Sequence, residues 1–204
     1  MTDSTEQFWA GEFGNSYTAR NQIDPVARVP FFRKIIQLAT PEDVLEVGCN
    51  RGHNLMAIKM ADPTIGIAGC DINEGALDEA QKSLPLAELE ICLAKEIESV
   101  FTIGGFGYDL VMTAGVLIHI PPEDLEGVMQ SIIRTANDWI LAIEYDYPTA
   151  EEVEYRGHDG KLWRRPYGKM YRDRGLKLIY TADVGPAEGF GDGCTAWLLQ
   201  KVAS

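Results

Sequence analysis

The sequence predicts a single α/β domain built on a seven-stranded, mostly parallel sheet with helices on both faces. Apolar runs of strand-like composition alternate with segments whose apolar residues recur at helical spacing, which is typical of strand–helix–strand crossover units. The last two apolar runs are separated only by the glycine-rich stretch 184–194. That stretch is too short for a crossover helix, so we expect an antiparallel hairpin there. With 204 residues, 46% of them hydrophobic, the chain can build one sizeable core.

The strands and two helices follow from local patterns. The predicted strands are 43–48, 65–71, 88–93, 108–114, 139–145, 176–183 and 195–202. Pro121-Pro122 precedes the clearest helix, whose apolar face is formed by Leu125, Val128, Met129, Ile132 and Ile133. A second helix is expected to begin at the cap Asp24-Pro25, to be divided near Pro30, and to end at Thr40-Pro41.

Composition disfavours several classes of partner. The chain has 18 basic and 31 acidic residues, and the net charge of −13 weakens attraction to nucleic acid and to anionic lipid. No segment approaches the roughly 20 apolar residues of a membrane span, and the start is not that of a signal peptide. Cys49, Cys70, Cys92 and Cys194 are widely spaced, so we expect reduced thiols and no metal site. A cytoplasmic protein with a small-molecule substrate is predicted.

The strongest functional signal is the segment VLEVGCNRGHN, residues 44–54. A buried strand runs there into Gly48 and then Gly52, a turn that holds a ligand at the strand end and brings it close to the helix start. Glu46 lies two residues before the turn, where a carboxylate suits the cationic amino group of a methionine moiety and repels a pyrophosphate. Asp71 lies 25 residues after Glu46, near the spacing at which an acid meets adenosine ribose hydroxyls. We therefore expect S-adenosylmethionine rather than NAD.

This combination, over about residues 40–145, resembles the class I S-adenosylmethionine-dependent methyltransferases. The resemblance implies a Rossmann-like fold, with Glu46, Gly48 and Gly52 at the methionine part of the cofactor and Asp71 at the ribose. Asn50 stands where that family has its middle glycine, and asparagine tolerates positive φ better than most residues. The expected cofactor-binding residues are Tyr17, Arg20, Glu46, Gly48, Cys49, Asn50, Gly52, Asn54, Asp71, Ile72, Lys95, Glu96, Ile97, Thr113, Ala114 and Gly115.

Residues after the fourth and fifth strands are expected to face the reacting methyl group. His119 is the best candidate for a general base by its intrinsic pKa, although it equally suits a cap or packing role at the helix start. Glu144, Tyr145 and Asp146 end the fifth strand and are further catalytic candidates. Methyl transfer from a sulfonium depends mainly on positioning, so a base need not exist.

A basic segment follows the fifth strand. It contains seven of the 18 basic residues, namely Arg156, Lys161, Arg164, Arg165, Lys169, Arg172 and Arg174. Such a local excess favours an anionic substrate, and a turn at HDGK between two short strands would make a lid. The expected substrate-binding residues are Arg156, His158, Trp163, Arg164, Arg165 and Tyr167. The alternative is a solvated surface that balances the net charge.

The opening of the chain carries a second resemblance. The pattern EFG, two residues, Y, two residues, RN, joined to EVGCNRGHNL, is similar to the pseudaminic-acid-biosynthesis-associated methylases. That resemblance implies a sugar-related anionic acceptor. It also implies that Tyr17 and Arg20 close over the site, with Arg20 at the methionine carboxylate. A packing role for this segment is the alternative.

Together these patterns divide the one domain into a helical cap (1–40), a cofactor-binding core (41–147), a basic lid (148–175) and a terminal hairpin (176–204). The predicted function is methyl transfer to an oxygen or nitrogen of a small, anionic, sugar-related acceptor. Another metabolite or a protein as acceptor, and a non-catalytic adenosylmethionine-binding module, are the alternatives. The acceptor, the number of methyl groups and the oligomeric state stay open.

Overall fold

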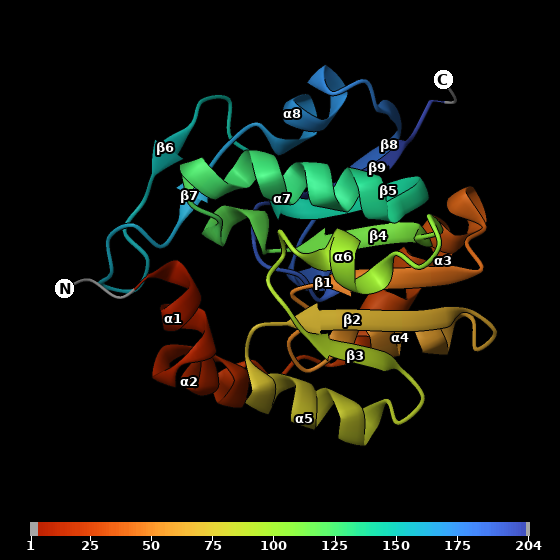
Figure 1. The fold of residues 1–204 in the computed structure, drawn as a ribbon, viewed down its shortest axis with the longest axis horizontal. Coiled ribbons are helices and arrows are strands. Elements are labelled where there is room, and N and C mark those ends of the chain that lie inside the picture. The colour runs from red at the N-terminus through yellow and green to blue at the C-terminus, as the bar shows by residue number, and fades with distance from the viewer. Residues whose placement is uncertain (1–3, 203–204) are drawn as a thin grey trace.

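The computed structural model describes residues 4–202. Its main sheet has seven strands in the order β3-β2-β1-β4-β5-β9-β8 (Figure 1). The strands are β1 (Asp43–Val47), β2 (Gly66–Asp71), β3 (Glu88–Ile91), β4 (Tyr108–Ala114), β5 (Ala136–Tyr145), β8 (Lys177–Val184) and β9 (Cys194–Gln200). The first five are parallel, and β9 pairs antiparallel with both β5 and β8. All seven predicted strands and the predicted terminal hairpin are confirmed.

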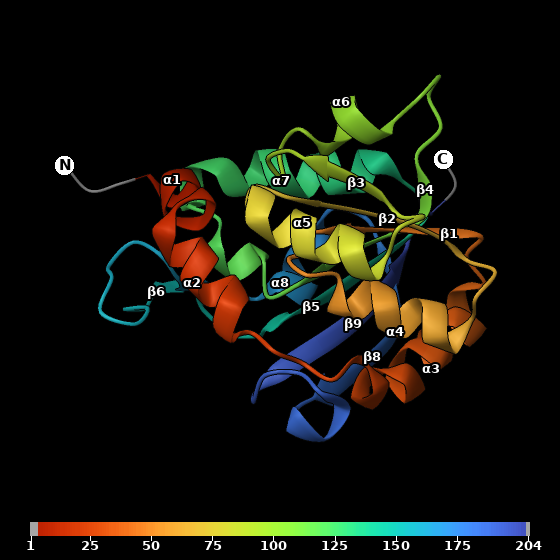
Figure 2. The same cartoon turned by 90° about the horizontal axis from the view of Figure 1, so that it is seen from below.

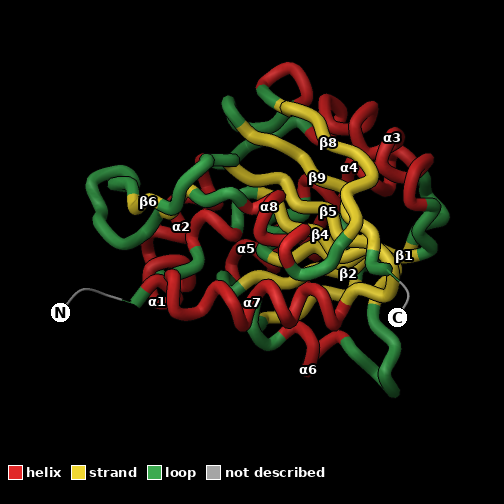
Figure 3. Tube along the Cα trace, turned by 90° about the horizontal axis from the view of Figure 1, so that it is seen from above, coloured by secondary structure: helices red, strands yellow, loops and turns green. Residues whose placement is uncertain are grey.

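Helices cover both faces of this sheet (Figures 2 and 3). The α-helices are α1 (Thr5–Ala10), α2 (Glu12–Arg20), α3 (Val29–Ala39), α4 (His53–Ala61), α5 (Glu74–Ser83), α6 (Ile97–Phe101), α7 (Pro122–Thr135) and α8 (Tyr167–Asp173). Short 3-10 helices are η1 (Pro25–Arg28), η2 (Leu117–His119) and η3 (Pro186–Glu188). Helices α3, α4 and α5 pack in one hydrophobic core, and α6, α7 and α8 pack in the other. No helix within residues 4–202 is long and apolar enough to cross a membrane.

Strand β5 shows how the sheet separates the two cores. Successive side chains of a strand point to opposite faces. Ile140 and Ala142 belong to the core beneath α7 and α8, whereas Leu141 and Ile143 belong to the core beneath α3 and α4. The same alternation places Glu144 on the α7–α8 side of the sheet.

The two predicted helices are present. Helix α7 begins at Pro122 and buries Leu125, Val128, Met129 and Ile132. The other begins with η1, where the Asp24 side chain accepts a hydrogen bond from the Val26 amide at 2.9 Å. It becomes α-helical at Val29, next to Pro30, so the predicted division is also found.

Two small additions lie beyond the carboxyl ends of the parallel strands. Helices α1 and α2 form one, and the hairpin of β6 (Glu151–Glu152) and β7 (Trp163–Arg164) forms the other (Figure 1). The predicted pair of short strands is therefore confirmed, but the position of the turn was wrong. The chain reverses between Tyr155 and His158, where Arg156 and Gly157 have φ values of 52° and 83°, and not at HDGK. A glycine adopts this conformation without strain.

The four cysteines are all free and buried, as predicted for core thiols.

Candidate active site

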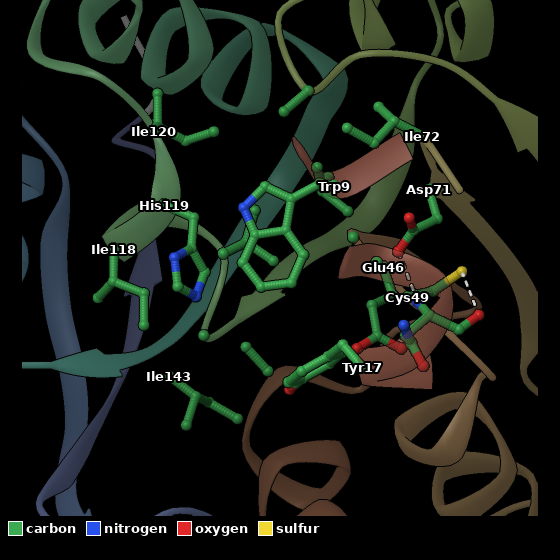
Figure 4. A pocket seen from close by; sticks show the side chains of 18 of the residues that line it. Trp9, Tyr17, Glu46, Cys49, Asp71, Ile72, Ile118, His119, Ile120 and Ile143 are labelled. Carbon is green, nitrogen blue, oxygen red and sulfur yellow. Dashed lines mark hydrogen bonds between the residues drawn. The ribbon is translucent and has the colours of Figure 1, made fainter. Parts of the chain in front are cut away.

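A cavity of about 680 Å³ opens at the carboxyl ends of the parallel strands. The loops after β1, β2, β3 and β4 form its floor, and α1, α2 and the β6–β7 hairpin supply residues from above. Figure 4 shows Glu46, Asp71 and Tyr17 on one side of the Trp9 indole, with His119 on the other. Ligands of open α/β sheets bind at this edge.

The turn after β1 adopts the conformation that its sequence predicts. Gly48 and Asn50 have φ values of 71° and 46°, so the asparagine does take the left-handed conformation. The Asn50 amide donates to Asp71 Oδ2 at 2.9 Å, and its side-chain Nδ2 donates to Thr18 Oγ1 of α2 at 2.9 Å. Asn50 therefore ties the turn both to β2 and to the helices above the cavity.

Gly52 lies where the start of α4 approaches α5. It lies outside the cavity lining, and a Cβ at this position would be 2.8 Å from Leu84 Cδ1 and 3.5 Å from Ala80 Cβ. The glycine allows α4 to start close against α5.

Glu46 is buried at the end of β1, with 2% of its surface exposed. Its Oε1 accepts a hydrogen bond from Asn54 Nδ2 at 2.6 Å, while Oε2 has no partner within residues 4–202. Burial raises the pKa of the Glu46 carboxyl to about 8, against the lowering effect of Asn54 and of the nearby Arg28. A buried carboxyl with a free oxygen suits a cationic ligand group.

Arg28 is the cationic counterpart of Glu46 in the same cavity. It is 6% exposed, and burial lowers its pKa. Its Nη1 donates to Asn54 Oδ1 at 2.6 Å, and Nε and Nη2 donate to the Gly189 carbonyl at 3.0 and 2.8 Å. A guanidinium has five N–H donors, so capacity remains for a ligand. Asn54 bridges the two charged groups, which make no direct ion pair.

Asp71 lines the cavity at the end of β2. Its carboxylate accepts from the Asn50 amide and, at 2.9 Å, from the Asn73 amide. Burial raises the pKa of Asp71, and these two backbone hydrogen bonds oppose the rise. A carboxylate offers about four lone-pair sites, so it can still accept from ligand hydroxyls.

Only part of the segment that follows β3 contributes residues to the cavity lining. Lys95 lines the cavity and pairs with Glu6 of α1 at 2.8 Å. The expected Glu96, Ile97 and Thr113 lie outside the lining. Ile97 and Thr113 are buried at 0% and 1% exposure, and Glu96 Oε2 accepts from the Leu93 amide instead. The structure therefore does not bring these three residues to the cavity. Of the other expected cofactor residues, the lining includes Tyr17, Glu46, Gly48, Cys49, Asn50, Asn54, Asp71, Ile72, Ala114 and Gly115.

His119 lines the cavity with a defined protonation state. Its Nδ1 lies 2.7 Å from the Lys161 carbonyl oxygen, which can only accept, so Nδ1 carries the proton. Withdrawal from solvent lowers the pKa of His119 to about 4. The ring packs against Trp9 and Tyr155, at centroid distances of 4.5 and 4.9 Å. A neutral imidazole with an unprotonated Nε2 can accept a proton.

The three residues at the end of β5 differ in position. Tyr145 lines the cavity, but burial raises the pKa of its hydroxyl to about 12. Glu144 is fully buried outside the lining, and its pKa is raised to about 7 by burial. Asp146 is exposed to solvent, also outside the lining. Of these three catalytic candidates, the structure therefore brings only Tyr145 to the cavity.

The basic segment is mainly structural. Of the expected substrate-binding residues, only Arg164 lines the cavity, 3.6 Å from Glu151. Trp163, Arg165 and Tyr167 are buried at 7%, 4% and 0% exposure. Arg156 and His158 are exposed on the hairpin, outside the lining. The structure therefore does not bring these five residues to the cavity, because a cluster in sequence does not fix which way its side chains point.

Arg20 also differs from the expectation. It is exposed, and its guanidinium lies over the rings of Phe13 and Tyr17 at 5.1 and 5.5 Å. Tyr17 lines the cavity, whereas Arg20 does not. The cation beside Glu46 is Arg28, which no sequence signal singled out because it appears as one residue of a helical stretch. Trp9 also lines the cavity, and no role was predicted for it from the sequence.

Comparison with known proteins agrees with this geometry. Residues 45–138 match the family model described as a methyltransferase domain. A search of curated protein sequences found no match.

Three solved structures share the fold. The 1,6-didemethyltoxoflavin-N1-methyltransferase of Burkholderia thailandensis, with S-adenosylhomocysteine bound, has a TM-score of 0.72 at 13% identity, over 100% of this chain and 92% of the other. Magnesium protoporphyrin IX methyltransferase from Synechocystis, with S-adenosylmethionine bound, gives 0.66 at 14% identity, over 98% and 99%. A Clostridium acetobutylicum S-adenosylmethionine-dependent methyltransferase gives 0.65 at 12% identity, over 94% and 98%.

These comparisons show that the chain has the class I, Rossmann-like methyltransferase fold and that residues 45–138 match a methyltransferase domain.

Proposed function

We propose that this protein transfers a methyl group from S-adenosylmethionine to an oxygen or nitrogen of a small acceptor. The observation that carries the proposal is the arrangement of Arg28, Asn54 and Glu46. A buried cation and a buried carboxyl are held apart by an amide, and Glu46 Oε2 has no partner within the described part of the chain. The methionine end of the cofactor is a zwitterion, so its ammonium matches Glu46 and its carboxylate matches Arg28.

The rest of the cofactor fits the remaining lining. Asp71, which lines the cavity beside Ile72, would accept hydrogen bonds from the ribose hydroxyls. Ala94 and Lys95, also in the lining, would flank the adenine. When bound, S-adenosylmethionine supplies an electrophilic methyl group on a sulfonium. The protein's own contribution is to hold donor and acceptor in line and to exclude water.

His119 is the proposed proton acceptor. Its Nδ1–H bond to the Lys161 carbonyl fixes the tautomer, and Figure 4 shows the other ring nitrogen turned toward the space between Trp9 and Ile143. A hydroxyl or amine of an acceptor bound in that space would lose its proton to Nε2. The low pKa of His119 keeps the ring neutral at physiological pH.

A small-molecule acceptor is supported by the cavity of about 680 Å³, to whose lining α1, α2 and the β6–β7 hairpin contribute residues. The similar structures named above include enzymes with toxoflavin-type and porphyrin substrates. The sequence resemblance favours a sugar-related anionic acceptor, and Arg164 in the lining is the residue of the basic segment that supports it. The four free cysteines support a location in the reducing cytoplasm.

A transfer assay tests this function. Methyl-labelled S-adenosylmethionine is incubated with the protein and with panels of nonulosonic acids, sugar nucleotides, phenols and amines, and methylated products are detected by mass. We expect one small-molecule class to be methylated, with an Arg164→Ala variant raising the KM for an anionic acceptor only. Cofactor binding without turnover on any panel would instead support the non-catalytic module, and methylation of proteins alone would support the protein-methylating alternative.

A further inference from the structure

His119 lies in the turn formed by residues 116–120. Two buried side chains outside the cavity lining, Glu144 and Arg165, make hydrogen bonds to the backbone of this turn. Glu144, at the end of β5, accepts hydrogen bonds at its Oε1 from the Val116 and Leu117 amides, both at 3.2 Å. These amides stand at the amino end of η2.

Arg165 holds the other end of the same turn. Its Nη1 donates to the Leu117 and Ile120 carbonyls at 3.3 and 3.0 Å, and lies 3.3 Å from the Tyr167 hydroxyl oxygen. The Glu144 carboxyl group therefore accepts hydrogen bonds from N–H groups of the turn, and the Arg165 guanidinium donates to its carbonyls.

The same stretch of chain also fixes the imidazole. Lys161 lies four residues before Arg165, and its carbonyl oxygen accepts from His119 Nδ1. The position of that carbonyl relative to η2 depends on how the β7 stretch is attached to the turn. Among the described contacts, Arg165 is the charged side chain that attaches the β7 stretch to the turn, through its hydrogen bonds to the Leu117 and Ile120 carbonyls.

The positions of Glu144 and Arg165 suit neither contact with an acceptor nor a large contribution to the stability of the fold. Glu144 and Arg165 are 0% and 4% exposed and lie outside the cavity lining. Within residues 4–202, Glu144 Oε2 and Arg165 Nη2 have no hydrogen-bond partner. Buried charges with unused hydrogen-bonding capacity cost stability compared with apolar side chains, so their role lies in the geometry that they impose.

We propose that Glu144 and Arg165 are positioning residues that hold His119 as the Nδ1–H tautomer, with Nε2 available to the acceptor. The catalytic meaning of this inference rests on the proposed function, but the tautomer itself is measurable without an acceptor. The two residues act through the turn, because each is hydrogen-bonded to its backbone. We call this pair, Glu144 and Arg165, the clamp.

Imidazole nitrogen-15 NMR spectra at neutral pH test the proposal. The chain has three histidines, His53, His119 and His158, and a His119→Gln variant assigns the signals of interest. In the wild-type protein we expect His119 to be the Nδ1–H tautomer. Glu144→Ala and Arg165→Met should each convert it to a mixture of tautomers. Glu144→Gln, which keeps an acceptor oxygen for the two amides, should retain the wild-type signal.

Lys169→Met is the matched control, because it removes an exposed cation from the same basic segment. It should leave the His119 signal unchanged. Where Glu144→Ala or Arg165→Met does not fold, Glu144→Asp and Arg165→Lys replace them, since each retracts the charged group and should give a partial mixture. An unchanged His119 tautomer in folded variants at both positions would overturn the proposal.

Activity separates this inference from the proposed function. If the clamp holds a catalytic base, the folded variants should lose kcat while the acceptor KM and the cofactor affinity change little. Full activity of His119→Gln would refute the base but leave the tautomer result standing. A wild-type tautomer in every clamp variant would refute the clamp and leave the base in place.

Discussion

Replacing Arg28 by methionine should weaken binding of S-adenosylmethionine about 30- to 4,000-fold. The substitution removes the cation proposed to meet the methionine carboxylate and keeps an unbranched apolar stem. Truncating one partner of a buried, hydrogen-bonded charge pair costs about 2–5 kcal/mol, and each 1.4 kcal/mol is about tenfold in affinity. Isothermal calorimetry with S-adenosylhomocysteine as well as S-adenosylmethionine measures the change.

Arg20→Met is the matched control for this experiment. Arg20 is exposed and lies over two aromatic rings outside the cavity lining. We expect its loss to change cofactor affinity by less than about threefold, because surface substitutions usually alter free energies by no more than about 0.5 kcal/mol. If Arg20→Met abolished binding while a folded Arg28→Met bound normally, the carboxylate would belong at Arg20, as the sequence resemblance implies. Thermal unfolding of both variants shows whether Arg28→Met is folded.

His119→Gln should lower kcat about 10²- to 10⁴-fold, the usual contribution of a positioned general base. Glutamine keeps much of the side-chain volume and offers no basic nitrogen. Cofactor affinity should be nearly unchanged, because His119 lies on the far side of Trp9 from Glu46 and Asp71 (Figure 4).

The pH dependence of the wild-type enzyme provides a second measurement on His119. Because burial lowers the pKa of His119 to about 4, the ring becomes charged only near that pH. The kcat/KM for an acceptor of high pKa should therefore show no loss from protonation of this group between pH 7 and about pH 5. A descending limb centred near 6.5, the ordinary histidine value, would contradict the buried environment described here.

Local features of the sequence predict most of the fold. The strand–helix alternation locates all seven strands, Asp24-Pro25 caps η1, and Asn50 takes the positive φ of the cofactor turn. Each of these depends on residues close in sequence, where backbone sterics and hydrogen bonding act directly. The terminal hairpin follows from the short link between its strands.

The parts of the site that were missed depend on contacts between distant segments. Arg28 reaches the cavity because its guanidinium binds the Gly189 carbonyl, 161 residues away. Arg164 and Arg165 are neighbours in sequence, yet Arg164 lines the cavity whereas Arg165 is buried against η2. A count of basic residues contains no information on side-chain direction. Gly52 fits a cofactor motif in the sequence, but in the fold the Leu84 side chain lies close to where a Cβ of residue 52 would be.

The number of protons released on cofactor binding tests the account of the methionine site most directly. Burial raises the pKa of Glu46 to about 8, so the free protein holds a proton there at pH 7. The cofactor ammonium favours the ionised carboxylate, and the pKa of Glu46 falls on binding. Calorimetry at pH 7 in buffers of different ionisation enthalpy should show release of close to one proton by the wild-type protein and of none by Glu46→Gln. Binding without proton release, or equal release by Glu46→Gln, would contradict the assignment of Glu46 to the methionine ammonium.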